Sequence, residues 1–189
     1  IVVGKDYLRT PIFSGEITQV ILSPYWNVPS SIATRELWPK ERKSPGYLAG
    51  EHIEVVNGRL RQRPGPWNSL GLIKFNIPNR YGVYLHDTPA KNLFDESART
   101  FSHGCMRIEK PVELAAWLLR DRPEWSRERI VTESRLGVET TIEVRKPLPV
   151  HVLYWTVYAG EEGEIHFVPD VYHRDAPLQA AMHRPPSLF

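Results

Sequence analysis

The positions of apolar and polar residues predict a chain built mainly of short strands. Residues 1–5 and 17–22 are rich in Ile and Val, and we expect them to pair, with Pro11 and Gly15 in the connection between them. Further apolar or alternating runs predict strands at 70–75, 81–86, 140–145, 150–158 and 165–168. The pattern therefore favours a β-rich fold.

Two of these runs, 70–75 and 81–86, are predicted to form a hairpin around the Pro-Asn pair at 78–79. Successive side chains of a strand point to opposite faces of its sheet. We therefore expect Tyr84 and His86 on the same face of the second strand, with His86 at its end.

Outside residues 23–66, helices are predicted only in the second half of the chain. An apolar stripe indicates a helix that begins at Pro111 and ends before Pro123, and it consists of Val112, Leu114, Ala115, Leu118 and Leu119. Ser126 is expected to cap a second helix, which ends near Gly137.

Residues 23–66 differ from the rest, because prolines and glycines repeatedly interrupt the pattern. Ser30 and Ser31 are expected to cap a short helix that reaches about Leu37. Proline at position 39 and the glycines beyond it then break the chain. We interpret 23–66 as an irregular excursion beside the core, either a surface insertion or a substrate-facing one.

Taken together, these elements predict a single domain over residues 1–189. Its fold class is mainly β, a mixed sheet or sandwich with a few short helices and the inserted excursion. Residues 176–189 are expected to form a peripheral tail.

The amino-acid composition and the net charge argue against some classes of partner. The chain has 189 residues, of which 41% are hydrophobic and 24% charged, with a net charge of +2. This balance argues against a nucleic-acid partner or an anionic membrane surface. No apolar run is long enough for a membrane span. The chain opens at Ile1 without an initiator Met, so we expect a domain cut from a longer precursor.

The chain contains one cysteine, Cys105, within the run Ser-His-Gly-Cys-Met-Arg at 102–107. A single cysteine excludes an intramolecular disulfide and a zinc site built on cysteine pairs. Only about 3% of a free thiol is thiolate at neutral pH, so a nucleophilic cysteine needs a base or a lowered pKa. The histidine and arginine beside it point to a reactive thiol.

Two histidines are candidates for the base. His103 shares the face of Cys105 in an extended segment, but the two Cβ atoms would be roughly 6–7 Å apart. His86 could come from the adjacent strand, where opposed Cβ atoms are about 4.5–5.5 Å apart. We therefore favour His86 as the base and keep His103 as the alternative. If His86 is the base, His103 is expected to shape the pocket.

Asp87 follows His86 directly, so in a strand its carboxylate points to the opposite face. Its main-chain carbonyl could orient the imidazole instead. The carboxylate is expected to cap the turn at 88–89.

The cysteine run also supplies candidates for binding a developing oxyanion. The amide of Cys105 is one donor, and Gly104 would let a carbonyl group approach closely. Arg107 lies on the same face as Cys105, where it could favour the thiolate or bind a substrate carboxylate. A surface salt bridge is the alternative role of Arg107.

At these residues the chain resembles the L,D-transpeptidases of the YkuD family. The family motif is a histidine, a gap of about fifteen residues, and Ser/Thr-His-Gly-Cys followed by one residue and Asn or Arg. Here it comprises His86 and the run 102–107. The flanking segments 24–29, 45–48, 65–71 and 84–89 are similar to the YcbB branch, and the resemblance extends from about Ile1 to Tyr172.

The resemblance implies a cysteine-dependent enzyme that cross-links peptidoglycan in the periplasm or cell envelope. Cys105 would attack the diaminopimelate carbonyl of a donor tetrapeptide stem, D-Ala would leave, and an acceptor-stem amine would resolve the thioester as a 3→3 cross-link. His86 would be the base, held by the carbonyl of Asp87. Main-chain amides near Tyr84 and Cys105 would form the oxyanion hole.

The resemblance implies no metal or organic cofactor, and it implies that carbapenems acylate Cys105. In the YcbB branch an insertion before the cysteine motif forms a substrate-capping subdomain, and 23–66 occupies that place but looks short for it. The peptidoglycan-binding module and membrane anchor usual in that branch are absent from this sequence.

Further side chains are candidates for substrate contact, although the aromatic ones and Arg99 could equally be packing residues. They are Tyr25, Trp26, Asn27, Trp67, Asn68, Arg99, Ser102, His103 and Arg107.

Three alternatives remain open at the level of the sequence. Water could resolve the same thioester, which would make the protein an L,D-carboxypeptidase. The domain could bind peptidoglycan without catalysis. Finally, His86, His103 and Cys105 could hold a zinc ion with a water as the fourth ligand.

Overall fold

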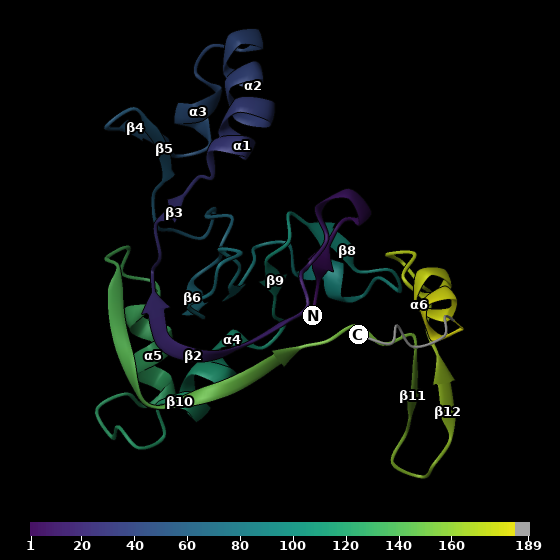
Figure 1. Ribbon diagram of the computed structural model, residues 1–189. Coiled ribbons are helices and arrows are strands. Elements are labelled where there is room, and N and C mark those ends of the chain that lie inside the picture. Colours follow the sequence, from purple (N-terminus) through teal and green to yellow (C-terminus); the bar gives the residue numbers. More distant parts are fainter. Residues whose placement is uncertain (184–189) are drawn as a thin grey trace.

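The computed structural model describes residues 1–183, so residues 184–189 of the expected tail lie outside the described residues. It confirms a β-rich fold with short helices (Figure 1). None of the helices within residues 1–183 is long and apolar enough to cross a membrane.

The central sheet has five strands in the order β10-β2-β6-β7-β9. They are β2 (Phe13–Leu22), β6 (Ile73–Asn76), β7 (Leu85–His86), β9 (Met106–Arg107) and β10 (Thr140–Val152). All neighbours are antiparallel except β7 and β9, which run parallel. The predicted hairpin of β6 and β7 is confirmed, with shorter strands than expected.

One face of this sheet is buried by two helices, α4 (Pro111–Leu118) and α5 (Arg127–Glu133). The predicted stripe of α4 supplies Ala115, Leu118 and Leu119 to the core. Ser126 caps α5 as expected, because its hydroxyl accepts from the amide of Arg129 at 3.3 Å.

The period-two pattern assigns residues to the two faces of the sheet. Val20 and Phe75 are fully buried and face the helices. Lys74 precedes Phe75 in the strand, so it lies on the opposite face, and its partner His86 in the adjacent strand lies on that face as well. That opposite face carries the polar side chains of the pocket described below.

Two expected strands in the second half of the chain are one long strand. β10 runs through Pro147 and Pro149, with a register shift between Glu143 and Leu148. The prolines are tolerated because β10 is at the edge of the sheet, where one side of the backbone needs no partner. The strand then ends at Val152, and 153–156 separates it from β11.

The expected pairing of 1–5 with 17–22 is wrong. β1 (Val3–Gly4) pairs in parallel with β8 (Thr100–Ser102), the strand directly before the cysteine. β2 already has neighbours on both sides, β6 and β10, so no edge is free for the N-terminal segment. The N-terminus therefore supports the cysteine loop.

Residues 23–66 are more ordered than the sequence suggested. They contain β3 (Trp26–Asn27), α1 (Ser30–Ile32), a π-helical turn (Ala33–Leu37), α2 (Trp38–Lys43), α3 (Tyr47–Gly50), β4 (Ile53–Val56) and β5 (Arg59–Gln62). The strands form a three-stranded sheet in the order β3-β5-β4. This insertion has its own apolar cluster, in which Leu37, Leu48 and Leu60 are buried.

The helix in the insertion is longer than expected. It continues from Ser30 to Lys43, and Pro39 does not break it. Pro39 lies at the start of α2, directly after the π-helical turn, where its missing N–H costs little. Pro29, and not a serine, occupies the N-cap position, and no side chain caps this end.

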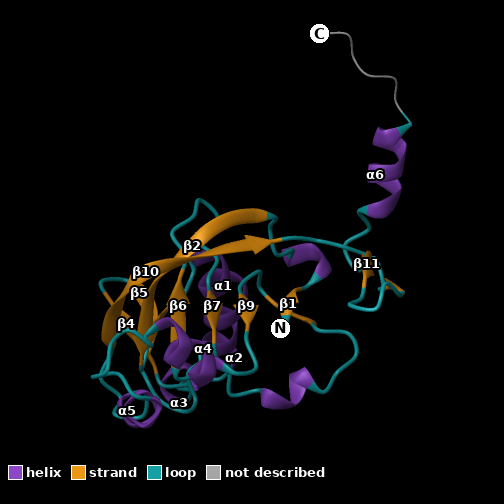
Figure 2. Cartoon of the chain, turned by 90° about the horizontal axis from the view of Figure 1, so that it is seen from below, coloured by secondary structure: helices purple, strands orange, loops and turns teal. Residues whose placement is uncertain are grey.

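The remaining elements are peripheral. A hairpin of β11 (Val157–Ala159) and β12 (Ile165–Phe167) turns at 160–163, and α6 (Asp175–Met182) follows it. Figure 2 shows α6 projecting away from the body. Short 3-10 helices span Asp6–Leu8 and Lys91–Phe94.

Candidate active site

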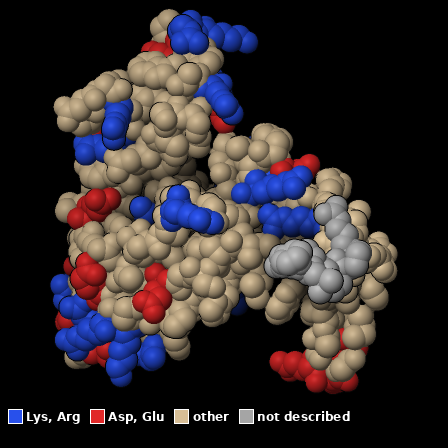
Figure 3. All heavy atoms as spheres, viewed as in Figure 1, with Lys and Arg blue, Asp and Glu red and all other residues tan. Residues whose placement is uncertain are grey.

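A pocket of about 660 Å³ lies between the insertion and the polar face of the sheet. The space-filling view shows the molecule hollowed at this junction (Figure 3). The insertion contributes Trp26, Glu36 and Tyr47 to its lining, and the opposite wall includes Tyr84 and Cys105.

The wall formed by the sheet is organised in rows across β6, β7 and β9, which lie side by side (Figure 2). Lys74 pairs with His86, and His86 pairs with Arg107, so these three residues form one row. Tyr84 and Cys105 precede His86 and Arg107 by two positions and share their face. The strands of His86 and the cysteine are adjacent as predicted, but Arg107, not Cys105, is directly opposite His86.

His86 is 5% exposed, and its ring orientation is set by its neighbour. The imidazole Nδ1–H donates to the main-chain oxygen of Asp87 at 2.5 Å. A carbonyl oxygen only accepts, so Nδ1 carries the proton and Nε2 carries the lone pair. Burial lowers the pKa of His86 to about 4, so the ring is neutral at pH 7.

The carboxylate of Asp87 does not cap the turn at 88–89, contrary to expectation. It accepts from the amide of Leu72 at 2.9 Å and forms an ion pair with Lys91. These contacts hold Asp87 on the far side of the strand from the imidazole. The hydroxyl of Thr88 accepts from the amide of Ala90 at 3.2 Å and stabilises that turn instead.

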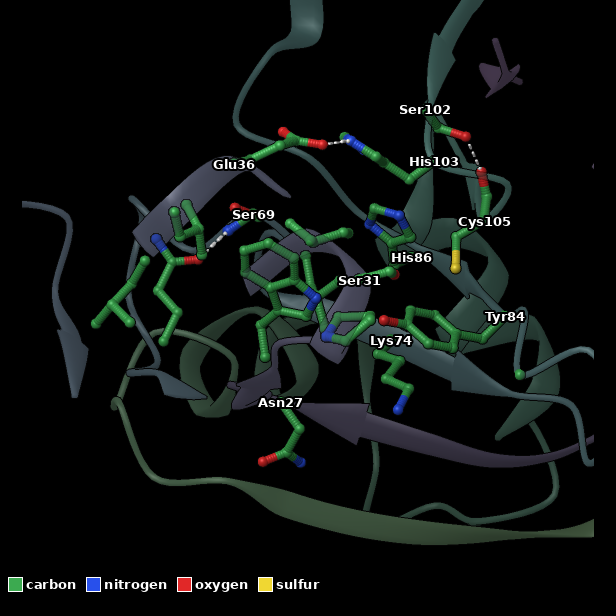
Figure 4. Close-up of a pocket in the computed structure, with 18 of the residues that line it drawn as sticks. Asn27, Ser31, Glu36, Ser69, Lys74, Tyr84, His86, Ser102, His103 and Cys105 are labelled. Carbon is green, nitrogen blue, oxygen red and sulfur yellow. Dashed lines mark hydrogen bonds and ion pairs between the residues drawn. The ribbon is translucent and has the colours of Figure 1, made fainter. Parts of the chain in front are cut away.

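The Cys105 thiol is partly buried and points into the pocket (Figure 4). Burial raises the pKa of Cys105, while hydrogen bonds from Tyr84 and the charges of Lys74 and Arg107 act in the opposite direction. Burial has the larger effect, so the resting group is a neutral thiol beside a neutral imidazole.

Tyr84 links the two reactive groups. Its ring centroid lies 5.7 Å from that of His86, in an edge-on arrangement. Burial raises the pKa of the phenol, and the neighbouring Cys105 raises it further while Trp26 of the insertion lowers it. The predicted placement of Tyr84 and His86 on one side is consistent with this contact.

The loop before Cys105 is held by its own serine and by the N-terminal segment. The Ser102 hydroxyl donates to the Cys105 carbonyl at 2.5 Å and accepts from the Gly104 amide at 3.1 Å. Gly104 adopts φ 112°, a conformation that other residues rarely take. The Thr10 hydroxyl donates to the Gly104 carbonyl and accepts from the Gly4 amide, both at 2.9 Å.

Sequence reasoning missed two of the residues in this support, Thr10 and Tyr172. The Tyr172 hydroxyl donates to the Gly4 carbonyl at 2.7 Å and accepts from the Thr10 amide at 3.3 Å. Both residues are distant in sequence from Cys105, and no local pattern marks them.

His103 is directed toward the insertion and not toward the thiol (Figure 4). Its Nε2 lies 2.7 Å from Oε1 of Glu36 in the π-helical turn. The three side chains considered for zinc therefore do not converge. Across residues 1–183, no group of three or more His, Cys, Asp and Glu side chains is placed to hold a metal ion.

Most candidate substrate residues do line the pocket, namely Tyr25, Trp26, Asn27, Ser102, His103 and Arg107. Three others do not. Trp67 stacks on His52 with ring centroids 3.8 Å apart, and Arg99 donates to the Glu96 carbonyl at 2.9 Å. Asn68 is fully buried and donates to the Pro24 carbonyl at 3.0 Å, so it holds the base of the insertion.

Four charged residues of the lining were not anticipated, namely Glu36, Lys40, Glu51 and Lys74. Glu36 meets His103, as described above, and Lys74 is in the row of His86. The Lys74 ammonium lies 4.3 Å from the centroid of the Tyr84 ring, and burial lowers its pKa. Strand alternation could have placed Lys74 on this face, since it precedes the buried Phe75.

Comparisons with known proteins agree with this geometry. Residues 1–147 match the family model YkuD, described as the L,D-transpeptidase catalytic domain. A Haemophilus influenzae protein named "Putative L,D-transpeptidase" is 30% identical over 202 residues, which cover 96% of this chain and 41% of the relative. The chain thus spans about two fifths of the length of that relative.

Proposed function

Because the chain belongs to the YkuD family of L,D-transpeptidase catalytic domains, we propose that it is a peptidoglycan L,D-transpeptidase with Cys105 as its nucleophile. One observation carries the proposal. The only cysteine of the chain lies in a pocket beside His86, whose Nε2 carries a free lone pair.

In the first step, His86 Nε2 takes the thiol proton as Cys105 Sγ attacks the carbonyl of the L-centre of diaminopimelate in a donor tetrapeptide stem. The C–N bond to D-Ala then breaks, and the protonated His86 returns its proton to the departing amine. The products are free D-Ala and a thioester on Cys105.

In the second step, an amine of an acceptor stem attacks the thioester, and His86 takes a proton from that amine. The C–S bond breaks and the proton returns to Sγ. The new amide is a 3→3 cross-link when the acceptor amine belongs to a second diaminopimelate. Burial keeps His86 neutral at pH 7, so the base form is available for both steps.

The negative charge that develops on the carbonyl oxygen needs nearby donors. Within the described residues, the Cys105 amide donates to no protein acceptor, whereas the Met106 amide is already bound to the Tyr84 carbonyl at 3.1 Å. We assign the oxyanion hole to the Cys105 amide and the main chain near Tyr84. Gly104 supports it by allowing the backbone conformation that aims this amide.

We also propose the substrates and the location of the protein. The substrates are donor and acceptor stem peptides of peptidoglycan, which place the protein in the cell envelope, in the periplasm. The insertion at 23–66 covers the donor, since Trp26 and Glu36 form the wall of the pocket opposite the sheet. We also propose that the chain belongs to the YcbB-like branch, which the similarity of the flanking segments supports.

Acylation by a carbapenem tests the nucleophile. Intact-mass spectrometry should show one adduct on the wild-type protein and none on Cys105→Ala. His86→Ala should slow acylation strongly, whereas His103→Ala should retain the adduct. An unmodified wild-type protein would overturn the proposal, and loss of acylation in His103→Ala alone would overturn the choice of base.

Turnover of a donor tetrapeptide, with and without a D-amino acid, tests the reaction. Exchange of the terminal D-Ala supports transfer. Release of tripeptide without exchange or dimer would make the protein an L,D-carboxypeptidase instead. Binding to peptidoglycan without any turnover would identify a non-catalytic module.

A further inference from the structure

Lys74 is a half-buried cation whose ammonium no acidic side chain contacts, and the more distant Glu139 only partly opposes the lowering of its pKa by burial. Among residues 1–183 no carboxylate lies within 4.0 Å of its ammonium group. Its partner is the face of the Tyr84 ring, 4.3 Å from the ammonium. A cation taken out of water in this way is costly unless an anion compensates it.

A second cation of the pocket, like Lys74, has a side chain whose polar atoms are not fully paired. Arg107 lies at the other end of the row, beyond His86, and its Nε is buried without a hydrogen-bond partner. Adjacent strands are about 4.8 Å apart, so the backbones of Lys74 and Arg107 are separated by roughly 10 Å. The floor of the pocket therefore presents two separated positive charges, one on each side of the imidazole.

The proposed donor stem supplies two negative charges near the bond that is cleaved. One is the terminal carboxylate of D-Ala, one residue from the attacked carbonyl. The other is the side-chain carboxylate of diaminopimelate, several bonds away. In Figure 4 the Tyr84 ring stands between the Lys74 side chain and the Cys105 sulfur. Lys74 is thus placed for a carboxylate at some distance from the attacked carbon.

From this arrangement we infer that Lys74 is a specificity residue that binds a carboxylate of the donor stem, the side-chain carboxylate of diaminopimelate. This inference rests on the proposed function. Arg107, two residues from Cys105, is left for the nearer carboxylate. The cation–π contact holds the ammonium in place while the pocket is empty.

Steady-state kinetics of three donor peptides test this inference. The first is the diaminopimelate tetrapeptide, the second has L-lysine in place of diaminopimelate and lacks the side-chain carboxylate, and the third ends in D-alaninamide. A charge-assisted hydrogen bond corresponds to about a 10- to 100-fold effect, so Lys74→Met should lower kcat/KM for the first donor by that factor, mainly through KM.

The decisive comparison is between donors. The wild type should prefer diaminopimelate over lysine, and Lys74→Met should lose this preference while it still discriminates against D-alaninamide. Lys74→Arg should retain part of the preference. If Lys74→Met lost discrimination against D-alaninamide instead, Lys74 would bind the terminal carboxylate. If neither preference changed, the inference would be wrong.

Two controls separate this role from others. Iodoacetamide carries no charge and can alkylate only one cysteine, so its rate with Lys74→Met should fall far less than kcat/KM for the diaminopimelate donor, by no more than the loss of the Lys74 charge near the thiol explains. A fall in this rate as large as the fall in kcat/KM would show that Lys74 acts mainly on the thiol. Lys146→Met, at an exposed position of β10, should leave all donors unaffected. A wild type that turns over no donor would remove the proposed function and this inference with it.

Discussion

Protonation of His86 should destabilise the fold at mildly acidic pH. The imidazole is 5% exposed and neutral, and its pKa in the folded protein is about 4 against an ordinary value of 6.5. The unfolded chain therefore binds a proton at a higher pH than the folded protein. Stability is complete above pH 6.5 and is lost as the pH falls toward 4.

The size of the effect follows from the two pKa values. The full loss below pH 4 is about 3 kcal/mol, since each pKa unit corresponds to about 1.4 kcal/mol. Between pH 7.5 and pH 5.0 the expected loss is about 2 kcal/mol by the same relation. Most carboxylates remain ionised over this range, so the histidine dominates the difference.

Urea titrations at pH 7.5 and pH 5.0 measure this difference in the free energy of unfolding. His86→Gln removes the titrating group and should reduce the pH-dependent loss to a few tenths of a kcal/mol, about the size of a minor surface effect. His151→Gln, at an exposed position of β10, should keep the wild-type difference. The reasoning is refuted if His86→Gln and the wild type lose the same free energy between the two pH values.

Three further changes test the supports of the cysteine loop and of a core helix. Thr10→Val deprives the Gly4 amide and the Gly104 carbonyl of a buried partner, so the free energy of unfolding in urea should fall by about 2–4 kcal/mol. Thr10→Ser keeps the hydroxyl and should lose about 1 kcal/mol; equal losses would contradict the hydrogen-bond assignment. Gly104→Ala should lower the free energy of unfolding by about 1–3 kcal/mol, because Gly104 has a φ of 112°. Gly50→Ala should leave it unchanged, because an added Cβ meets nothing within 4 Å. Thermal unfolding compares the two variants, and equal melting temperatures would argue against strain at Gly104. Ser126→Ala should lower the free energy of unfolding by about 1 kcal/mol, and Ser126→Asn should leave it almost unchanged. If the alanine variant were as stable as the wild type, the cap would add no stability.

Strand alternation predicted the core of the site well, because the pocket is built on one face of one sheet. A period of two placed Tyr84 and His86 on one face, in agreement with the structure. The suggestion that His86 comes from the strand adjacent to the cysteine also agrees, although Arg107 and not Cys105 is its direct partner. The same rule placed the Asp87 carboxylate on the opposite face, where it meets Leu72 and Lys91. Local periodicity is sufficient wherever neighbouring strands set the geometry.

The support of the cysteine loop could not be predicted in this way. The pairing of β1 with β8, and the contacts of Thr10 and Tyr172, join segments 94 to 162 residues apart. An Ile- and Val-rich run shows that a segment can form a strand, but it does not show which edge is free to accept it. That information depends on the order of the whole sheet, in which β2 has no edge to offer.

The second histidine of the motif shows how the two walls of the pocket are connected. Proximity in sequence suggested His103 as a partner of Cys105, yet its imidazole is bound to Glu36 of the insertion. This pair is partly exposed on both sides, so it contributes at most about 1 kcal/mol to stability. Its consequence is positional, because it joins the loop of Cys105 to the wall that carries Trp26. Trp26 and Tyr84 line the same pocket from its two walls. The insertion is therefore joined to the loop of the reacting thiol through His103 and Glu36, and a change in the insertion reaches Cys105 through this pair.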